Sequence, residues 1–456
     1  ASTGCVELVG HSMKTYPTDI YLGAGSRAFG TFRLGGETSL KMDKEVRFGL
    51  TSGSLGCIEL ADTSSLAVPE SFGIHGYVDG ASAVVSVTDE ATLTAPGELL
   101  IGCTNKYGCL KVQDNAKVLA RKISIAYPDA SKDFVMLGDL EISGSAVVSN
   151  VAQILLGRGK KALGTLKLNG GSLFLDYRRG EENSITLGSN GGFTDGVIRG
   201  WGWLGFDDAK KTMVDYVTEL GAEYWAGMTF CGQIIADGGV LDFSRGPVPT
   251  WAAARNNDCG TNGFFAVNKG LLKLQRSLPR KTANHKQVGM MPSHSDPVMV
   301  NTFRYTFDTA TMNTTGTYVF SELYAVDRSD IPAGLPTGKG IHHSVVWRIG
   351  HFNASATPDV DDEDLTADHK QNFTSLKLKF HYDPALAEIE GVRHVKVYRC
   401  TDSVNGGWTC VASITAPDSA SPYIETVEIA PSSELWNGGW FAIVGTPKVG
   451  TVMVVR

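Results

Sequence analysis

The chain has 456 residues, and its 41 Lys and Arg against 48 Asp and Glu give a formal net charge of −7. A hydrophobic content of 42% can build large cores and excludes a wholly disordered chain. The acidic balance argues against nucleic acid as a partner, because nonspecific binding relies on Lys and Arg to neutralise phosphates. Glycine is abundant, with 53 residues, but the absence of a Gly-X-Y period excludes collagen.

The N-terminal region carries a short strand pattern and no targeting pattern. Cys5–Val9 is predicted as a strand in which Val6 and Leu8 lie on one face. The sequence begins at Ala1 without a basic region and an apolar stretch, which indicates processing or trimming. No run approaches the roughly 18 consecutive apolar residues of a membrane span, so none is expected.

A repeat dominates the first two thirds of the chain. Four segments read glycine, any residue, aliphatic, polar, aliphatic: Gly56–Leu60, Gly108–Val112, Gly138–Ile142 and Gly164–Leu168. A fifth copy at Val85–Asp89 lacks the glycine. Copies begin about 25–30 residues apart, and each is followed by a second short alternating strand. Several are preceded by a strand that ends in glycine.

The repeat predicts a solenoid. One such unit cannot bury its own apolar face, whereas units stacked in parallel register, about 4.8 Å apart, close a continuous core. An antiparallel sandwich would also alternate, but it would not place glycine at fixed offsets in each period. The sequence therefore predicts an all-β fold with a right-handed parallel β-helix, in which glycine serves tight corners.

The repeat becomes looser towards residue 280. Met213, Val217 and Leu220 have helical spacing, so a helix is predicted at Asp207–Gly221 as an excursion from the solenoid. Gly263–Leu274 returns to the strand pattern.

The unit resembles the passenger repeats of autotransporter-type secreted bacterial β-helix proteins, in particular surface proteins with a PEP-type sorting signal. Ile154–Leu173 carries the motif best, and Gly263–Leu274 resembles the last rung of such helices. The resemblance covers roughly residues 40–280 and implies a secreted or surface-exposed β-helix. The chain departs from the family in showing neither a translocator barrel nor a sorting helix after the repeat.

The sequence pattern changes after the repeat, where isolated strands replace the regular units. We predict a β-helix over residues 1–280, a linker over 281–296 and an antiparallel β-sandwich over 297–456. Eight isolated strands support the sandwich: Asn301–Phe307, Thr317–Tyr324, Ser344–Ile349, Ser375–Tyr382, Val392–Arg399, Thr409–Ile414, Ile424–Ile429 and Trp440–Val444.

Eight cysteines are compatible with four disulfides, although spacing does not fix their connectivity. Cys400 and Cys410 flank a turn signal and are predicted to face each other across a hairpin. Cys103 and Cys109 likewise bracket a short loop. The remaining candidates are Cys5, Cys57, Cys231 and Cys259. The alternative is that these cysteines are reduced and buried as small hydrophobes.

One acidic run is a candidate calcium site. Its carboxylates are those of Asp359, Asp361, Asp362 and Asp364. The run lacks the glycine and spacing of an EF-hand loop, so a solvated acidic loop is the favoured interpretation. No other cofactor is expected, and zinc is not, because Cys and His do not cluster at ligand spacing.

These patterns predict an extracellular or cell-surface structural protein without enzymatic activity. It would form a filament, sheath or surface layer, or act as an adhesin, with itself and surface glycans as partners. Strand exchange between subunits would use Val6 and Leu8 at one end and Val452 and Val454 in the tail. The alternative is a carbohydrate-active β-helix enzyme, a polysaccharide lyase or glycoside hydrolase, or a sugar-binding module, which requires clustered carboxylates on one face.

Overall fold

The structure is a computed structural model in which the chain divides into two compact units. The first unit comprises Ala1–Lys211 and Asp215–Asn262, and the second comprises Thr212–Val214 and Gly263–Arg456. The predicted domain limits at residues 280 and 296 remain predictions. The structure describes residues 2–10, 13–16, 19–102, 106–126, 135–157, 162–176, 184–187, 195–206, 227–230, 232–243, 248–250, 264–277, 287–289, 302–307, 317–353, 376–400, 407–419, 423–426 and 439–447.

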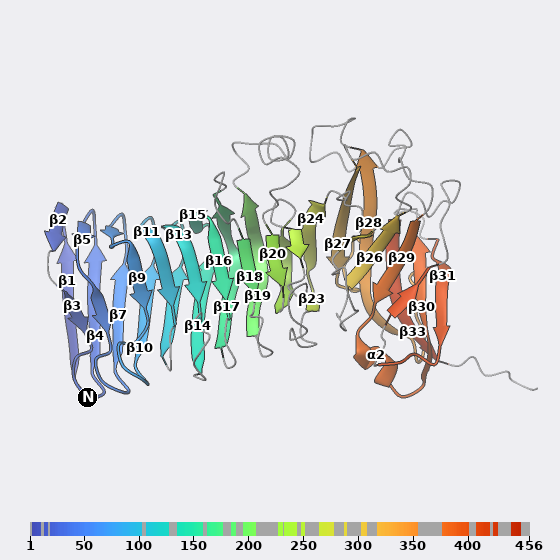
Figure 1. Cartoon of the computed structure of the whole chain (residues 1–456), viewed down its shortest axis with the longest axis horizontal. Coiled ribbons are helices and arrows are strands. Elements are labelled where there is room, and N and C mark those ends of the chain that lie inside the picture. The colour runs from blue at the N-terminus through green and yellow to red at the C-terminus, as the bar shows by residue number, and fades with distance from the viewer. Residues whose placement is uncertain are drawn as a thin grey trace, which may run out of the picture. The chain divides into compact units, whose positions relative to one another are not determined.

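The first unit is a right-handed parallel β-solenoid, which confirms the predicted β-helix (Figure 1). Its first ladder joins strands from successive turns, each parallel to and in register with the next. These strands are β1 (Thr3–Val9), β4 (Phe29–Gly35), β7 (Leu55–Leu60), β10 (Ser82–Val87), β12 (Tyr107–Val112), β14 (Met136–Ser143), β17 (Ala162–Leu175), β19 (Asp195–Phe206) and β21 (Gln233–Asp242).

Two further ladders of parallel strands complete most turns, and some long strands take part in two ladders. The second ladder contains β2 (Met13–Tyr16), β5 (Ser39–Met42), β8 (Ser65–Ala67), β11 (Thr92–Ile101), β13 (Lys117–Ile125), β15 (Val147–Val151) and β17. The third runs from β9 (Ser71–Ile74) through β11, β13, β16 (Gln153–Leu156), β18 (Ser184–Leu187) and β20 (Gly227–Phe230) to β22 (Val248–Thr250). β3 (Ile20–Leu22) pairs with β6 (Val46–Phe48) separately.

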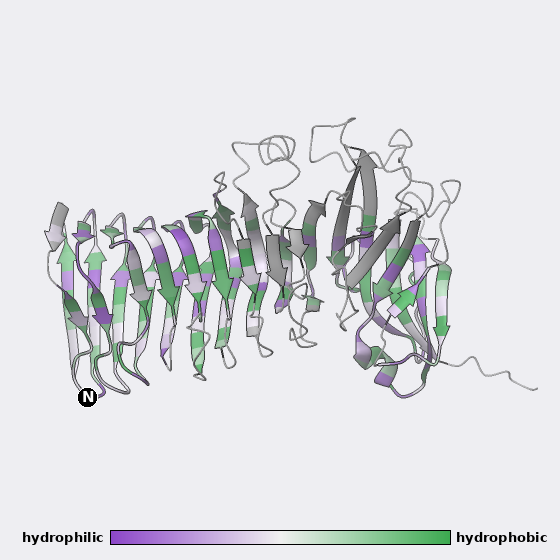
Figure 2. Cartoon of the chain, in the orientation of Figure 1, coloured by the Kyte–Doolittle hydropathy of each residue, from purple (hydrophilic) through white to green (hydrophobic). Residues whose placement is uncertain are grey.

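Along β10, buried residues alternate with partly exposed ones. Hydrophobic and hydrophilic residues are interspersed along the solenoid strands in Figure 2. On the first ladder Phe32, Ile58, Val85 and Leu110 stack on one another and are buried. Because each aliphatic side chain covers the one in the next turn, the apolar core is continuous along the solenoid.

The motif glycines form one column of the first ladder. Gly56, Gly108, Gly138 and Gly164 stack there, with Ala83 in the copy that lacks glycine. A Cβ at Gly164 would lie 2.5 Å from the Ile125 carbonyl oxygen and 2.6 Å from the Gly157 nitrogen, so close backbone approach requires glycine there.

The glycines that end the preceding strands serve a different purpose. Gly49, Gly102 and Gly157 have φ of 58°, 70° and 60°, which places them in the left-handed region. The two glycines of each turn therefore have distinct causes, one conformational and one steric.

The small-residue turn between the first and second ladders uses aspartate. Asp62, Asp89 and Asp114 take φ of 58°, 58° and 61°, a region that Asp tolerates better than most residues. The Asp89 carboxylate accepts the Asp62 amide at 3.1 Å, and the Asp62 carboxylate accepts the Gly36 amide at 2.7 Å. Each carboxylate thus ties its own turn to the preceding one.

The second unit contains antiparallel pairings. One run of pairs joins β24 (Leu271–Ser277), β27 (Thr317–Tyr324), β28 (His342–Asn353), β33 (Gly439–Pro447), β30 (Val392–Cys400) and β31 (Thr409–Thr415). A separate sheet joins β25 (Gln287–Gly289), β26 (Thr302–Phe307), β29 (Leu376–His381) and β32 (Tyr423–Glu425). β23 spans Phe264–Asn268. Strand β25 lies within the segment predicted as a linker.

A short helix, α2 (Pro384–Glu388), follows β29. It begins at Asp383, whose carboxylate accepts the Ala385 amide at 2.9 Å, and proline occupies its first turn. The helix predicted at Asp207–Gly221 lies outside the described residues. Within the described part of the chain, no helix has the length and apolar character that a membrane span needs.

Candidate functional site

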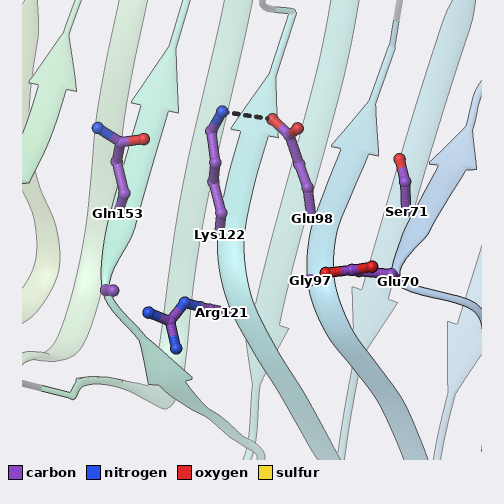
Figure 3. Close-up of a pocket in the computed structure, with 8 residues that line it drawn as sticks. Glu70, Ser71, Gly97, Glu98, Arg121, Lys122 and Gln153 are labelled. Carbon is purple, nitrogen blue, oxygen red and sulfur yellow. Dashed lines mark ion pairs between the residues drawn. The ribbon is translucent and has the colours of Figure 1, made fainter. Parts of the chain in front are cut away.

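A groove of about 490 Å³ lies on the outer surface of the third ladder. Figure 3 shows the polar side chains along it. Its main lining residues are Glu70, Ser71, Glu98, Arg121, Lys122 and Gln153.

The ladder register brings these side chains together from distant parts of the sequence. Ser71 pairs with Glu98, Glu98 with Lys122, and Lys122 with Gln153. Successive members therefore lie about 4.8 Å apart, although more than twenty residues separate them in the chain.

Glycine also shapes the groove. The Glu98 amide donates to the Glu70 carbonyl oxygen at 2.8 Å, which draws two turns together at the corner. A Cβ at Gly97 would overlap the Glu70 carbonyl oxygen and lie 2.7 Å from the Glu70 Cγ, so a larger residue would force the two turns apart at this corner.

Charge in the groove is partly compensated. The Lys122 ammonium lies 2.9 Å from Glu98 Oε1 (Figure 3). The buried Ser124 hydroxyl donates to the same oxygen at 2.5 Å. Glu98 is therefore held in one orientation as a hydrogen-bond acceptor. Carboxylate, ammonium, guanidinium and amide groups in an open groove suit a ligand rich in hydroxyl groups.

The predicted cysteine sites take a different form in the structure. Cys5, Cys57 and Cys109 lie in one column of the first ladder, separated by Thr31 and Val84. Cys5 is exposed, whereas Cys57 and Cys109 are buried. Two ladder spacings, about 9.6 Å, separate consecutive cysteines and exceed the Cα separation of roughly 7 Å that a disulfide spans. The prediction that Cys5 and Cys57 join disulfides is corrected for the described residues, which contain no disulfide.

The hairpin of Cys400 and Cys410 is present, but its predicted disulfide is not. A register shift in β30 and β31 places Cys410 opposite Tyr398, two residues before Cys400. Cys400 is buried whereas Cys410 is exposed. The prediction failed because the two strands pair in a register that never brings Cys400 opposite Cys410, and the turn sequence does not reveal that register.

Burial controls the chemistry of the ladder thiols. It raises the pKa of Cys57 to about 11 and also raises the pKa of Cys109. Because the thiolate is the reactive form, these two cysteines behave as packing residues near neutral pH. The Tyr107 hydroxyl beside Cys109 donates to Asp139 at 3.0 Å.

Several predicted sites lie outside the described residues. These are Cys103, Cys231, Cys259, Asp359, Asp361, Asp362, Asp364, Val452 and Val454. In the part of the chain that the structure describes, no group of three or more His, Cys, Asp or Glu is placed to hold a metal ion. Val6 and Leu8 are described, and both lie in β1 at the first turn of the solenoid.

The sequence did not predict the groove, because its residues occupy equivalent positions in successive turns but differ in residue type. The signal was available, since aligning the copies puts Ser71, Glu98, Lys122 and Gln153 at equivalent outward positions.

No protein-family model, curated protein or solved structure matches this chain.

Proposed function

We propose that this chain is a structural subunit of an extracellular or cell-surface assembly, such as a filament, sheath, surface layer or adhesin. The observation that carries the proposal is the open end of the solenoid core. Val6 stands in the same column as Phe32 and Ile58, yet it is 56% exposed against 5% and 1%.

An apolar end of this kind favours a further strand. Burying a side chain the size of valine or leucine contributes about 1.5–3 kcal/mol, and β1 offers Val6 and Leu8. Among the described residues β1 pairs only with β4, which leaves its other edge to receive main-chain hydrogen bonds. A strand from another subunit satisfies both requirements at once.

The proposed donor is the tail predicted as a strand at Thr451–Val455, with Val452 and Val454 on one face. Donation of this tail to β1 of the next subunit links subunits head to tail, which generates a linear assembly. The resemblance of the repeat to secreted autotransporter-type β-helices supports a surface location.

We further infer that the two sheets of the second unit pack as a sandwich. Phe380 of β29 and Phe441 of β33 lie in different sheets, and their ring centroids are 5.3 Å apart. Both side chains are fully buried, as expected of residues between two sheets.

Two variants test the lengthwise assembly. Val6→Asp places a charge at the open end, and deletion of 450–456 removes the proposed donor. Both are expected to abolish assemblies that electron microscopy detects for the full chain. Lys41→Asp, on an exposed position of β5, is the matched control and is expected to assemble normally. Unchanged assembly in the two test variants would contradict the proposal.

A second candidate function is glycan binding, which the polar lining of the Glu98 and Lys122 groove favours. Calorimetric titration with neutral and acidic oligosaccharides tests it. Lys122→Ala is expected to weaken binding at least tenfold while Lys41→Ala leaves it intact, on the scale of a lost charged hydrogen bond. Equal binding by both variants would exclude the groove.

A further inference from the structure

We propose that the outward face of the first ladder, from β1 to β17, is a surface through which two copies of this chain pair side by side. We call it the lateral face. It is separate from the open end of the core at Val6, and its pairing does not depend on the lengthwise assembly proposed above. Three columns of residues make up the face. The middle column contains the buried Thr31, Cys57 and Cys109, and the more exposed columns at its two sides carry the argument.

The first of these columns is charged. In order along the solenoid its members are Glu7, Arg33, Glu59, Ser86, Lys111, Glu141 and Lys167. The signs read negative, positive, negative, neutral, positive, negative, positive. Residues at equal distances from Ser86 therefore carry opposite charges.

This order is self-complementary under one rotation. A two-fold axis that runs along β10 (Figure 1), in the plane of contact, reverses the order of the turns and keeps each column facing itself. Glu59 of one copy then faces Lys111 of the other, Arg33 faces Glu141, and Glu7 faces Lys167. A strictly alternating column of seven charges would instead place like charges opposite each other. The neutral Ser86 interrupts the alternation, and this interruption makes the column complementary to itself.

The other column is mostly apolar and, like the charged column, is centred on β10. Its members are Thr3, Phe29, Leu55, Ser82, Tyr107, Leu137 and Leu163. The same rotation places Phe29 opposite Leu137 and Leu55 opposite Tyr107. Phe29, Leu137 and Leu163 are 37%, 41% and 39% exposed, so pairing would remove apolar surface from water.

The middle of the face permits close approach. Ser82, Val84 and Ser86 are its outward residues on β10, all of them small. Seven turns and the width of the three columns give a face of about 600 Å² per copy from ladder and strand spacings. Two copies would bury about 1,200 Å², the lower end of the range for stable interfaces, so the dimer should dissociate on dilution.

Ion pairs within one chain do not account for the pattern. Arg33 lies 2.6 Å from Glu59 and 3.7 Å from Glu7, and Lys167 lies 3.2 Å from Glu141. Exposed pairs of this kind stabilise a fold very little. In the paired arrangement they remain in place, and each charge gains an opposite charge on the second copy.

Charge reversal provides the test, with the oligomeric state of the full chain measured by sedimentation velocity over a concentration series. Wild type is expected to pair laterally, and Val6→Asp, which removes the lengthwise assembly, is expected to give the dimer alone. Glu59→Lys and Lys111→Glu are each expected to weaken dimerisation at least tenfold, because each variant creates two like-charge contacts. An equimolar mixture of the two variants should recover the wild-type affinity, since one copy is then positive at both positions and the other negative at both.

The controls separate this proposal from folding defects and from lengthwise assembly. Lys41→Glu, on the second ladder, should dimerise as wild type does, and Val6→Asp should keep the lateral dimer. Recovery in the mixture requires that both variants be folded, and circular dichroism checks this independently. A monomeric wild type, a dimer that neither reversal weakens, or a mixture no tighter than the single folded variants would overturn the proposal.

Discussion

The two units of the chain bury their residues in different ways. In the solenoid, similar aliphatic residues such as Ile58, Val85 and Leu110 stack from turn to turn. In the second unit the largest fully buried side chains include Trp347 and Tyr382. The comparison teaches that stability in the solenoid is a sum over neighbouring turns, whereas in the second unit it depends on a few particular residues.

The two units also differ in the exposure of their charged side chains. The ion pairs of the lateral face are exposed, but Glu322 in the second unit is buried. Its carboxylate lies 3.3 Å from Arg348 and 3.7 Å from Lys273, and it accepts the Tyr324 hydroxyl at 2.6 Å. Burial raises the pKa of Tyr324, which keeps this hydroxyl protonated as a donor.

The largest expected effect comes from truncating the core of the second unit. Trp347→Ala should cost about 3–5 kcal/mol, because it leaves a large cavity. We expect calorimetry to show loss of the second unit's transition while the solenoid's transition persists. Leu110→Ala, the comparison in the solenoid, should broaden the solenoid's transition without abolishing it. Equal loss of both transitions in either variant would contradict the division.

The next effect concerns the buried carboxylate. Glu322→Gln should destabilise the second unit by about 3 kcal/mol, because Arg348 and Lys273 lose their charged partner. Glu45→Gln breaks the exposed pair with Arg47 and should cost less than about 1 kcal/mol. Chemical denaturation of both variants measures the contrast, and equal costs would show that burial does not govern these pairs.

A smaller effect is expected at the glycine corners. Gly164→Ala should destabilise the solenoid by about 1–3 kcal/mol, because its Cβ meets backbone atoms that cannot rotate away. Gly53→Ala is less crowded, with its nearest atom 3.7 Å away on Arg27, but its φ of 75° adds a conformational cost of about 1 kcal/mol. A larger loss at Gly53 than at Gly164 in thermal unfolding would refute the steric explanation.

The smallest expected effect concerns the dependence of the solenoid's stability on pH. The pKa of Cys57 is raised to about 11 in the folded chain, above its ordinary value of 9.0, mainly by burial. The neutral thiol therefore adds stability that is complete below about pH 9 and lost as the pH rises through 11. Alkylation at pH 9 should modify exposed Cys410 well before Cys57. Similar rates for the two would contradict burial of the Cys57 thiol.

The sequence predicted the solenoid well because its cause is local and repeated. Gly108 and Gly138 each precede two inward-facing aliphatic residues at the same spacing. Aligning the copies on their glycines therefore reproduces the pairing of the strands in the ladder. The outward columns escaped prediction, because Glu59 and Lys111 become related only when the turns are stacked and read across the chain. The Glu98 and Lys122 groove was missed for the same reason.

Predictions were less accurate where no sequence repeat indicates how two strands pair. The hairpin of β30 and β31 was expected from its turn residues, but the register that places Cys410 opposite Tyr398 instead of Cys400 could not be inferred from those residues. The short helix after Asp383 also went unpredicted, since five residues are too few for helical periodicity to be read.

Hydrogen exchange over a concentration series tests the proposed assembly role most directly. The role requires β1 (Thr3–Val9) to receive a strand at its open edge, so its amides should become protected as the concentration of the full chain rises. Amides of β12, which are paired on both sides by β10 and β14, should exchange equally slowly throughout. Exchange of β1 that stays the same at every concentration at which assemblies form would contradict the role assigned to the open end of the core.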